Sequence, residues 1–246
     1  MPRYKITIEY DGTNISGWQR QLNSSSVQQF IEEAIGSFSH EKIVIFGAGR
    51  TDSGVHALAQ VAHFDLEKTY PEHVVIRAIN HFLRPNKIVI TSCQIVDKNF
   101  HARFSAKKRH YRYVILNRAA ISTLEENRSW HIREPLDIEK MQQAANFLIG
   151  HHDFTSFRAT HCQALSPIKT LDEIKIYQEE EKIIITIKAT SFLHHMVRNI
   201  TGTLVPVGLG KLIPEDIKKI LEEKIRRAAG PTAPAHGLYF SMVEYD

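Results

Sequence analysis

The chain has 246 residues, of which 43% are apolar and 24% are charged, so its composition is that of an ordinary globular protein with enough length to bury a large core. Its net charge of +4 is mildly basic, which is compatible with a polyanionic partner without requiring one. No apolar run approaches the roughly 18 residues of a membrane span, and the start lacks a secretory pattern, so we expect a cytoplasmic protein with no membrane partner. Because Cys93 and Cys162 are too few for a disulfide framework, we expect both to be free thiols.

The first half of the chain alternates strand and helix patterns. A strand over 4–10 ends in the turn signal Asp11-Gly12. Ser24–Ser26 provides a cap for a helix whose apolar residues recur at helical spacing from 27 to 35. A β-branched run at 43–46 predicts a buried strand. Further along, the patterns predict a strand over 61–66, a helix over 72–83 and a strand over 87–96.

The second half repeats this organisation. It predicts a strand over 109–116, a helix over 138–149, a hairpin of 174–177 and 183–189, an apolar helix over 195–207, a charged amphipathic helix over 214–227 and a last strand over 237–245. Strands joined through helices predict an α+β fold of two α/β lobes with mostly antiparallel sheets, comprising residues 1–105 and 106–246. We expect the active site in the cleft between such lobes.

The segment Phe46–His56 concentrates side chains that can carry out chemistry. It holds Arg50, Asp52 and His56 among three glycines, which permit sharp turns or close backbone approach. An Asp on such a turn suits catalysis, although the motif alone fits equally well an Asp52 that only caps a turn. A dinucleotide fingerprint is excluded, because Gly-x-Gly-x-x-Gly would need glycine where the chain has Asp52.

Basic and aromatic residues interleave around position 110, where Lys107-Lys-Arg-His110 is followed by Tyr111-Arg-Tyr113. Such a pattern suits stacked bases and phosphates, as does the pair Arg226-Arg227. The same alternation is also typical of a strand with one solvated face.

Several motifs spread along the chain resemble, in order, those of the bacterial tRNA pseudouridine synthase A family, the tRNA-uridine 38–40 isomerases. They are Ile8-Glu-Tyr-Asp-Gly12, Gly17-Trp-Gln-Arg20, Ala48-Gly-Arg-Thr-Asp-Ser-Gly-Val-His56, Phe100-His-Ala-Arg-Phe-Ser105, Tyr111-Arg-Tyr113, His152-Asp-Phe-Thr-Ser-Phe-Arg158, His194-His-Met-Val-Arg-Asn199 and Gly237-Leu-Tyr239. The resemblance covers nearly the whole chain.

The resemblance implies two ferredoxin-like or RRM-like lobes joined into one pseudouridine-synthase fold. It places the catalytic aspartate on Asp52, the active-site tyrosine on Tyr111, the arginine paired with the aspartate on Arg198, and a residue that holds the flipped-out nucleotide on Arg50. It also implies a homodimer that needs no metal or organic cofactor and that isomerises uridines 38, 39 and 40 in the anticodon stem-loop of tRNA.

The chemistry of these residue types agrees with those roles. Uridine isomerisation breaks the N1–C1′ bond and rejoins the uracil through C5, and an ionised carboxylate can promote it by attack at C1′ or C6 or by removing a proton from C2′. A nearby guanidinium such as Arg198 keeps a buried carboxylate ionised. The ring of Tyr111 can stack on the uracil, whereas Tyr4 and Tyr113 better fit the core.

The remaining candidates concern substrate binding. We expect the RNA to be bound by Lys107, Lys108, Arg109, Arg112 and His56, in addition to Arg50 and Tyr111. No histidine has metal-ligand spacing, and His194 and His195, adjacent on a predicted helix, should point apart, so we expect no metal site. The alternative is a catalytically silent RNA-binding or tRNA-chaperone relative, against which the combination of Asp52, Tyr111 and Arg198 argues.

Overall fold

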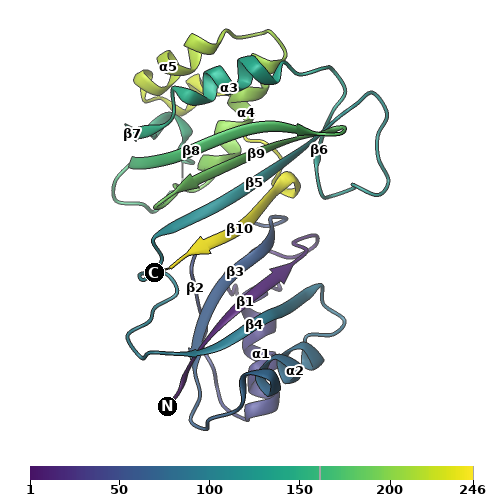
Figure 1. Ribbon diagram of the computed structural model, residues 1–246, viewed down its shortest axis with the longest axis vertical. Coiled ribbons are helices and arrows are strands. Elements are labelled where there is room, and N and C mark those ends of the chain that lie inside the picture. Colours follow the sequence, from purple (N-terminus) through teal and green to yellow (C-terminus); the bar gives the residue numbers. More distant parts are fainter. Residues whose placement is uncertain (161, 246) are drawn as a thin grey trace. The chain divides into compact units, whose positions relative to one another are not determined.

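In the computed structural model, which describes residues 1–160 and 162–245, the chain forms two compact units (Figure 1). Unit 1 consists of Met1–Lys107 and the chain from Tyr239 onward, and unit 2 is Lys108–Leu238. The last strand, which the sequence order predicts to belong to the second half, has its contacts in unit 1 instead. Among the described residues, no helix has both the length and the apolarity that crossing a membrane would take.

Unit 1 is a sheet with two helices. Its elements are β1 (Arg3–Tyr10), α1 (Val27–Ser39), β2 (Phe46–Gly47), β3 (His56–Asp65), α2 (Glu72–Phe82), β4 (Ile88–Val96) and β10 (Leu238–Glu244). The strand order is β4-β1-β3-β10, with β2 also paired to β3. All pairs are antiparallel except β3 with β10, which is parallel.

The core of unit 1 follows from the periodicity of its sequence. In β1 the alternate side chains of Tyr4, Ile6 and Ile8 have no exposed surface, as expected for a strand with one buried face. Helix α1 buries Ile31 and Ile35 completely and packs against α2. These elements confirm the predicted strand over 4–10 and the predicted helix from 27.

The β-branched run at 43–46 does not form the buried strand that the sequence predicts. Only Phe46 pairs with β3, and its side chain is 49% exposed. The backbone of Ile45 bonds to side chains of α1 instead, because its N–H donates to Glu32 Oε1 (3.1 Å) and its carbonyl accepts from Gln28 Nε2 (3.3 Å). Polar groups of a helix thus replace the neighbouring strand, which the apolar run alone does not reveal.

Unit 2 is also a sheet with helices, and α3, α4 and α5 lie on one side of it (Figure 1). Its elements are β5 (Lys108–Asn117), β6 (Trp130–Ile132), α3 (Ile138–Asn146), β7 (Gly150–Asp153), η1 (Thr155–Phe157), β8 (Ile168–Glu179), β9 (Lys182–Ala189), α4 (Met196–Gly208), α5 (Pro214–Glu223), η2 (Arg226–Ala228) and η3 (Ala235–Gly237). The strand order is β5-β9-β8-β7, all antiparallel, with β6 parallel to β5.

The α+β class with mostly antiparallel pairing is confirmed, and so is the hairpin, which is formed by β8 and β9. The short strands β6 and β7 were not predicted. The charged helix ends at Glu223 rather than at 227, because Lys224 takes a left-handed backbone conformation (φ 55°) that ends the helix.

Candidate active site

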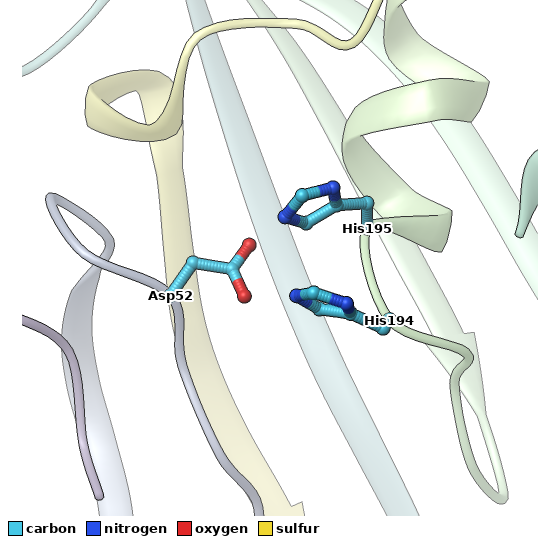
Figure 2. Close-up of side chains that lie close together, drawn as sticks. All are labelled: Asp52, His194 and His195. Atoms are coloured by element: carbon cyan, nitrogen blue, oxygen red, sulfur yellow. The ribbon is translucent and has the colours of Figure 1, made fainter. Parts of the chain in front are cut away.

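The loop that carries Asp52 connects β2 to β3 in unit 1 and turns sharply. The N–H of Val55 donates to the carbonyl of Asp52 (3.2 Å), and Gly54 takes a left-handed conformation (φ 79°) that favours glycine. Figure 2 shows the Asp52 side chain projecting from this loop. The glycine pattern of the motif thus has a local physical reason.

The segment that follows β1 holds this loop from the other side. The N–H of Trp18 donates to the carbonyl of Thr51 (3.1 Å), and the carbonyl of Ile15 accepts from Gly54 N (3.3 Å) and Ser53 Oγ (3.2 Å). These bonds surround Asp52 in sequence, so the backbone on both of its sides is anchored.

Two glycines let the anchoring segment approach closely. A Cβ at Gly12 would run into the carbonyl of Val55, and a Cβ at Gly17 would lie 2.5 Å from the carbonyl oxygen of Thr51. Gly17 also has a left-handed backbone (φ 83°). The motifs Asp11-Gly12 and Gly17-Trp18 are therefore needed for the backbone contact with the Asp52 loop.

Side chains complete the contact between the two segments. The hydroxyl groups of Tyr10 and Thr51 share a hydrogen bond (2.7 Å), and burial raises the pKa of Tyr10. Burial also works to raise the pKa of Asp11, but hydrogen bonds from Thr13 and Lys87 outweigh it and hold this pKa at about 2. The turn that starts at Asp11 therefore carries a negative charge at neutral pH.

His56, an expected substrate contact, is built into this framework. Its side chain is only 2% exposed, and its Nδ1 accepts a hydrogen bond from Gly12 N (3.0 Å) and lies 3.2 Å from Asp11 Oδ1. The ring also stacks on Tyr239 with a centroid distance of 4.8 Å. Within unit 1, the buried ring of His56 therefore connects the start of β3 to the turn at Asp11-Gly12.

In unit 2, Tyr111 lies on β5 opposite Ile187 of β9, and its ring packs edge-on against Phe192 at 4.9 Å. Tyr113, two residues further on the same face, has no exposed surface, and its hydroxyl donates to the carbonyl of Pro234 (2.8 Å). The expectation that Tyr113 is a core residue is confirmed, and the ring of Tyr111 is oriented by an aromatic neighbour.

Arg198 lies in the first turn of α4 and is fixed by a reciprocal contact with Ala233. Its Nε donates to the carbonyl of Ala233 (2.8 Å), while its own carbonyl accepts from Ala233 N (3.1 Å). Gly202 and Gly230 allow this approach, because a Cβ on either would collide with the opposing backbone. The segment 230–234 therefore sets the direction of the Arg198 side chain.

Arg226 holds that segment in place, a role that the sequence did not suggest. Its guanidinium donates to Asn199 Oδ1, Thr232 Oγ1 and the Gly230 carbonyl, each at 3.0 Å. Thr232 in turn donates to Asn199 Oδ1 (2.7 Å), and burial lowers the pKa of Arg226. In the sequence Arg226 stands out only as part of a basic pair that suits RNA, whereas the hydrogen bonds of its guanidinium are used inside unit 2.

The basic residues of β5 fall on two faces of the strand. Register and alternation put Arg109 on the face of Tyr111, and Lys108 and Arg112 on the opposite face. Lys108 Nζ lies 2.7 Å from Asp172 Oδ1, and Arg112 lies 3.0 Å from Glu179 Oε2, so both pair with carboxylates. Arg109 donates to the Thr190 carbonyl (2.8 Å).

Two predicted RNA contacts belong to unit 1. The backbone N–H of Lys107 donates to the carbonyl of Glu244 (2.8 Å), which ties the end of unit 1 to β10. Arg50 lies on the same loop as Asp52, and its side chain is exposed. The cations that we expected to act together are thus carried by a loop, a chain junction and two faces of a strand.

The adjacent histidines of unit 2 do not point apart as predicted. They precede α4 instead of lying within it, and the left-handed backbone of His195 (φ 61°) brings the two rings together at a centroid distance of 3.9 Å (Figure 2). The N–H of His194 also donates to Cys162 Sγ (3.4 Å). The close approach of the two rings removes the predicted obstacle to a shared metal ion.

Comparison with known proteins gives one consistent family. The family described as tRNA pseudouridine synthase matches residues 6–105 and 144–246. Proteins named tRNA pseudouridine synthase A from Ehrlichia canis (strain Jake) and Ehrlichia chaffeensis (strain ATCC CRL-10679 / Arkansas) are each 54% identical over 244 residues, 99% of this chain and 100% of their own length. The similarity to a solved chain from a Cbf5-Nop10-Gar1 complex is distant, with 11% identity and a TM-score of 0.36. It covers 92% of this chain and 60% of the solved chain.

Proposed function

Because the chain belongs to the tRNA pseudouridine synthase family, we propose that it isomerises uridine to pseudouridine in tRNA, at positions 38, 39 and 40 of the anticodon stem-loop. The observation that carries the proposal from family to chemistry is the anchored Asp52 loop. Its backbone is hydrogen-bonded on both sides of a single carboxylate, which is the arrangement expected of a pre-organised catalytic group.

Asp52 is the proposed catalytic residue. The N1–C1′ bond of uridine breaks, the uracil turns, a bond forms between C5 and C1′, and the C5 proton moves to N1 through solvent, so substrate and product are isomers. The carboxylate acts in its ionised form, by attack at C1′ or C6 or by removing the C2′ proton. A rigid loop favours each of these routes, because it prevents the carboxylate from moving away from the sugar.

Tyr111 and Arg198 have supporting roles in this proposal. The ring of Tyr111 stacks on the detached uracil while it turns, and its edge contact with Phe192 keeps the ring in one orientation. The guanidinium of Arg198 stabilises the ionised form of Asp52. The hydrogen bond from its Nε to the carbonyl of Ala233 fixes the guanidinium, and a planar guanidinium suits recognition of a carboxylate.

The target uridine must leave the base stack to be reached, at a cost of a few kcal/mol. We assign to Arg50 the stabilisation of the flipped-out nucleotide, and to Lys107 and Arg109 contacts with the RNA backbone. The proposal further includes a homodimer acting in the cytoplasm. Dimerisation is checked by sedimentation of the active enzyme, and an active monomer would contradict it.

The test of the proposed function uses a full-length tRNA transcript with tritium at C5 of its uridines. We expect the protein alone to release tritium, and carbodiimide mapping to place the product at positions 38–40. If the protein binds the transcript without releasing tritium, the alternative of a catalytically silent RNA-binding protein is correct. Product at other positions would retain the activity and reject the anticodon stem-loop as its target.

A further inference from the structure

A row of aromatic rings runs to the surface of unit 1. It consists of Phe46, His63, His101 and Phe104, and we call it the aromatic row. His63 stacks on Phe46 (5.2 Å between centroids), His101 lies 4.7 Å from His63, and Phe104 lies 4.4 Å from His101. The outer rings, Phe46 and Phe104, are 49% and 76% exposed.

His63, in the middle of the aromatic row, is held in place by burial and a hydrogen bond. His63 is 2% exposed, its Nδ1 accepts from Ala102 N (3.1 Å), and burial together with the charge of Arg3 lowers its pKa to about 4. The ring is therefore neutral at physiological pH. The ring of His63 links strand β3 to the loop that follows β4, and it stacks against the ring of Phe46.

The end of the aromatic row at Phe104 is also held in place. The turn 101–105 is closed by two hydrogen bonds, from Ser105 N to the His101 carbonyl (2.8 Å) and from His101 N to Ser105 Oγ (2.9 Å). The Nδ1 of His101 accepts from Arg103 N (3.2 Å), which fixes the orientation of its ring against Phe104. A large apolar side chain is thus presented to solvent by a turn with little freedom to bury it.

A large aromatic ring that a closed turn exposes to solvent is available for contact with a partner. The guanidinium carbon of Arg103 lies 5.6 Å from the centre of the Phe104 ring, so the exposed ring is accompanied by a positive charge. Aromatic rings with neighbouring cations are the means by which proteins stack unpaired bases of RNA.

We propose that Phe104, supported by the aromatic row, stacks on an unpaired nucleobase of the tRNA substrate outside the catalytic site. This inference rests on the proposed function, because it assumes that tRNA is the substrate. It assigns to the motif Phe100–Ser105 a role in substrate binding, and it explains why the exposed Phe104 is held in a tight turn.

The test compares Phe104→Ala and Phe104→Trp with Phe82→Ala, a matched control because Phe82 is also exposed, at 44%, but lies on α2. Binding of a full-length tRNA transcript is measured over a range of salt concentrations. We expect Phe104→Ala to raise Kd by roughly 5- to 100-fold, since stacking on one base contributes about that much. The salt dependence should not change, because stacking releases no counterions.

Phe104→Trp should retain the affinity, and its added fluorescence should be quenched by the transcript beyond the change seen for wild type, which contains Trp18 and Trp130. Phe82→Ala should bind like wild type. Equal Kd values for Phe104→Ala and wild type would overturn the proposal, and so would conversion of Phe104→Ala to a smaller oligomer, which would assign the ring to a contact between copies. Failure of wild type to bind or isomerise tRNA would instead reject the proposed function.

Discussion

The Asp52 loop and strand β5 were both identified from sequence because charged and aromatic residues gather there. Their backbones differ, since the first is a tight turn and the second a regular strand. In the loop, backbone hydrogen bonds from Trp18 and to Ile15 direct the chain around a single carboxylate. In β5 the regular alternation of a strand sends neighbouring cations to opposite faces, and Arg112 pairs with Glu179. Clustering in sequence therefore indicates a common site only where the backbone turns enough to bring the side chains together.

The largest effect is expected from the glycine that lets the loop be anchored. Gly17→Ala should lower the rate of isomerisation by about 100-fold or more, because the new Cβ displaces Thr51 and hence Asp52. Gly210→Ala is the matched control: Gly210 also has a left-handed backbone (φ 70°) but nothing within 4 Å of a Cβ. It should lose only about 1–2 kcal/mol of stability. Equal rates for the two variants at full folding would show that the anchoring does not matter.

Arg226 tests the same principle in unit 2, where the segment 230–234 directs Arg198. Arg226→Ala should cost about 3 kcal/mol of unfolding free energy, because Asn199 and Thr232 lose a charged partner. It should also lower kcat by roughly 10-fold when Arg198 is misplaced. Arg227→Ala, the exposed neighbour, should change neither quantity. A kcat for Arg226→Ala equal to that of wild type would confine Arg226 to stability.

The acid response of the anchoring segment depends on Asp11. Because its folded-state pKa of about 2 lies below the ordinary value of 3.8, its ionised form stabilises the fold above pH 3.8, and this contribution is lost as the pH falls towards 2. We expect Asp11→Asn to remove about 2 kcal/mol at pH 7 and to flatten the pH dependence of unfolding below pH 4. Denaturant titrations at pH 7 and below pH 4 measure both effects, and parallel curves for the two proteins would contradict this assignment.

The smallest effect separates the two faces of β5. Arg109 shares the face of Tyr111, so Arg109→Ala should reduce the slope of log affinity against log salt by about 1. Arg112→Ala should leave this slope nearly unchanged, and loss of its partly exposed ion pair should cost at most about 1 kcal/mol of stability. Equal changes of slope would place phosphates on both faces of the strand.

Sequence patterns predicted an element correctly where interactions between neighbouring residues determine its structure. Helix α1 follows from its apolar spacing and from Ser26, whose Oγ accepts from Gln29 N (3.2 Å) at the predicted cap. The prediction of a buried strand at 43–46 is wrong because side chains of α1, in place of a neighbouring strand, form hydrogen bonds with the backbone of Ile45. The pairing of β10 with β3 could not be predicted because it joins distant parts of the chain.

The same limit applies to the candidate site. Asp52 could be identified because its glycines and neighbours are close in sequence. The support that Arg226 gives to the segment 230–234 could not, because it also requires Asn199 of α4, which lies 27 residues away in the sequence. The paired rings of His194 and His195 depend on one left-handed residue, for which a histidine gives little signal.

The central claim is that the carboxylate of Asp52 performs the isomerisation, and single-turnover tritium release from C5-labelled tRNA tests it most directly. Asp52→Asn keeps the size of the side chain and removes its charge, and Asp65→Asn changes a carboxylate that pairs with Arg3 in the same unit. We predict that Asp52→Asn binds tRNA but releases no tritium, while Asp65→Asn remains active. Tritium release by Asp52→Asn at the wild-type rate would contradict the account.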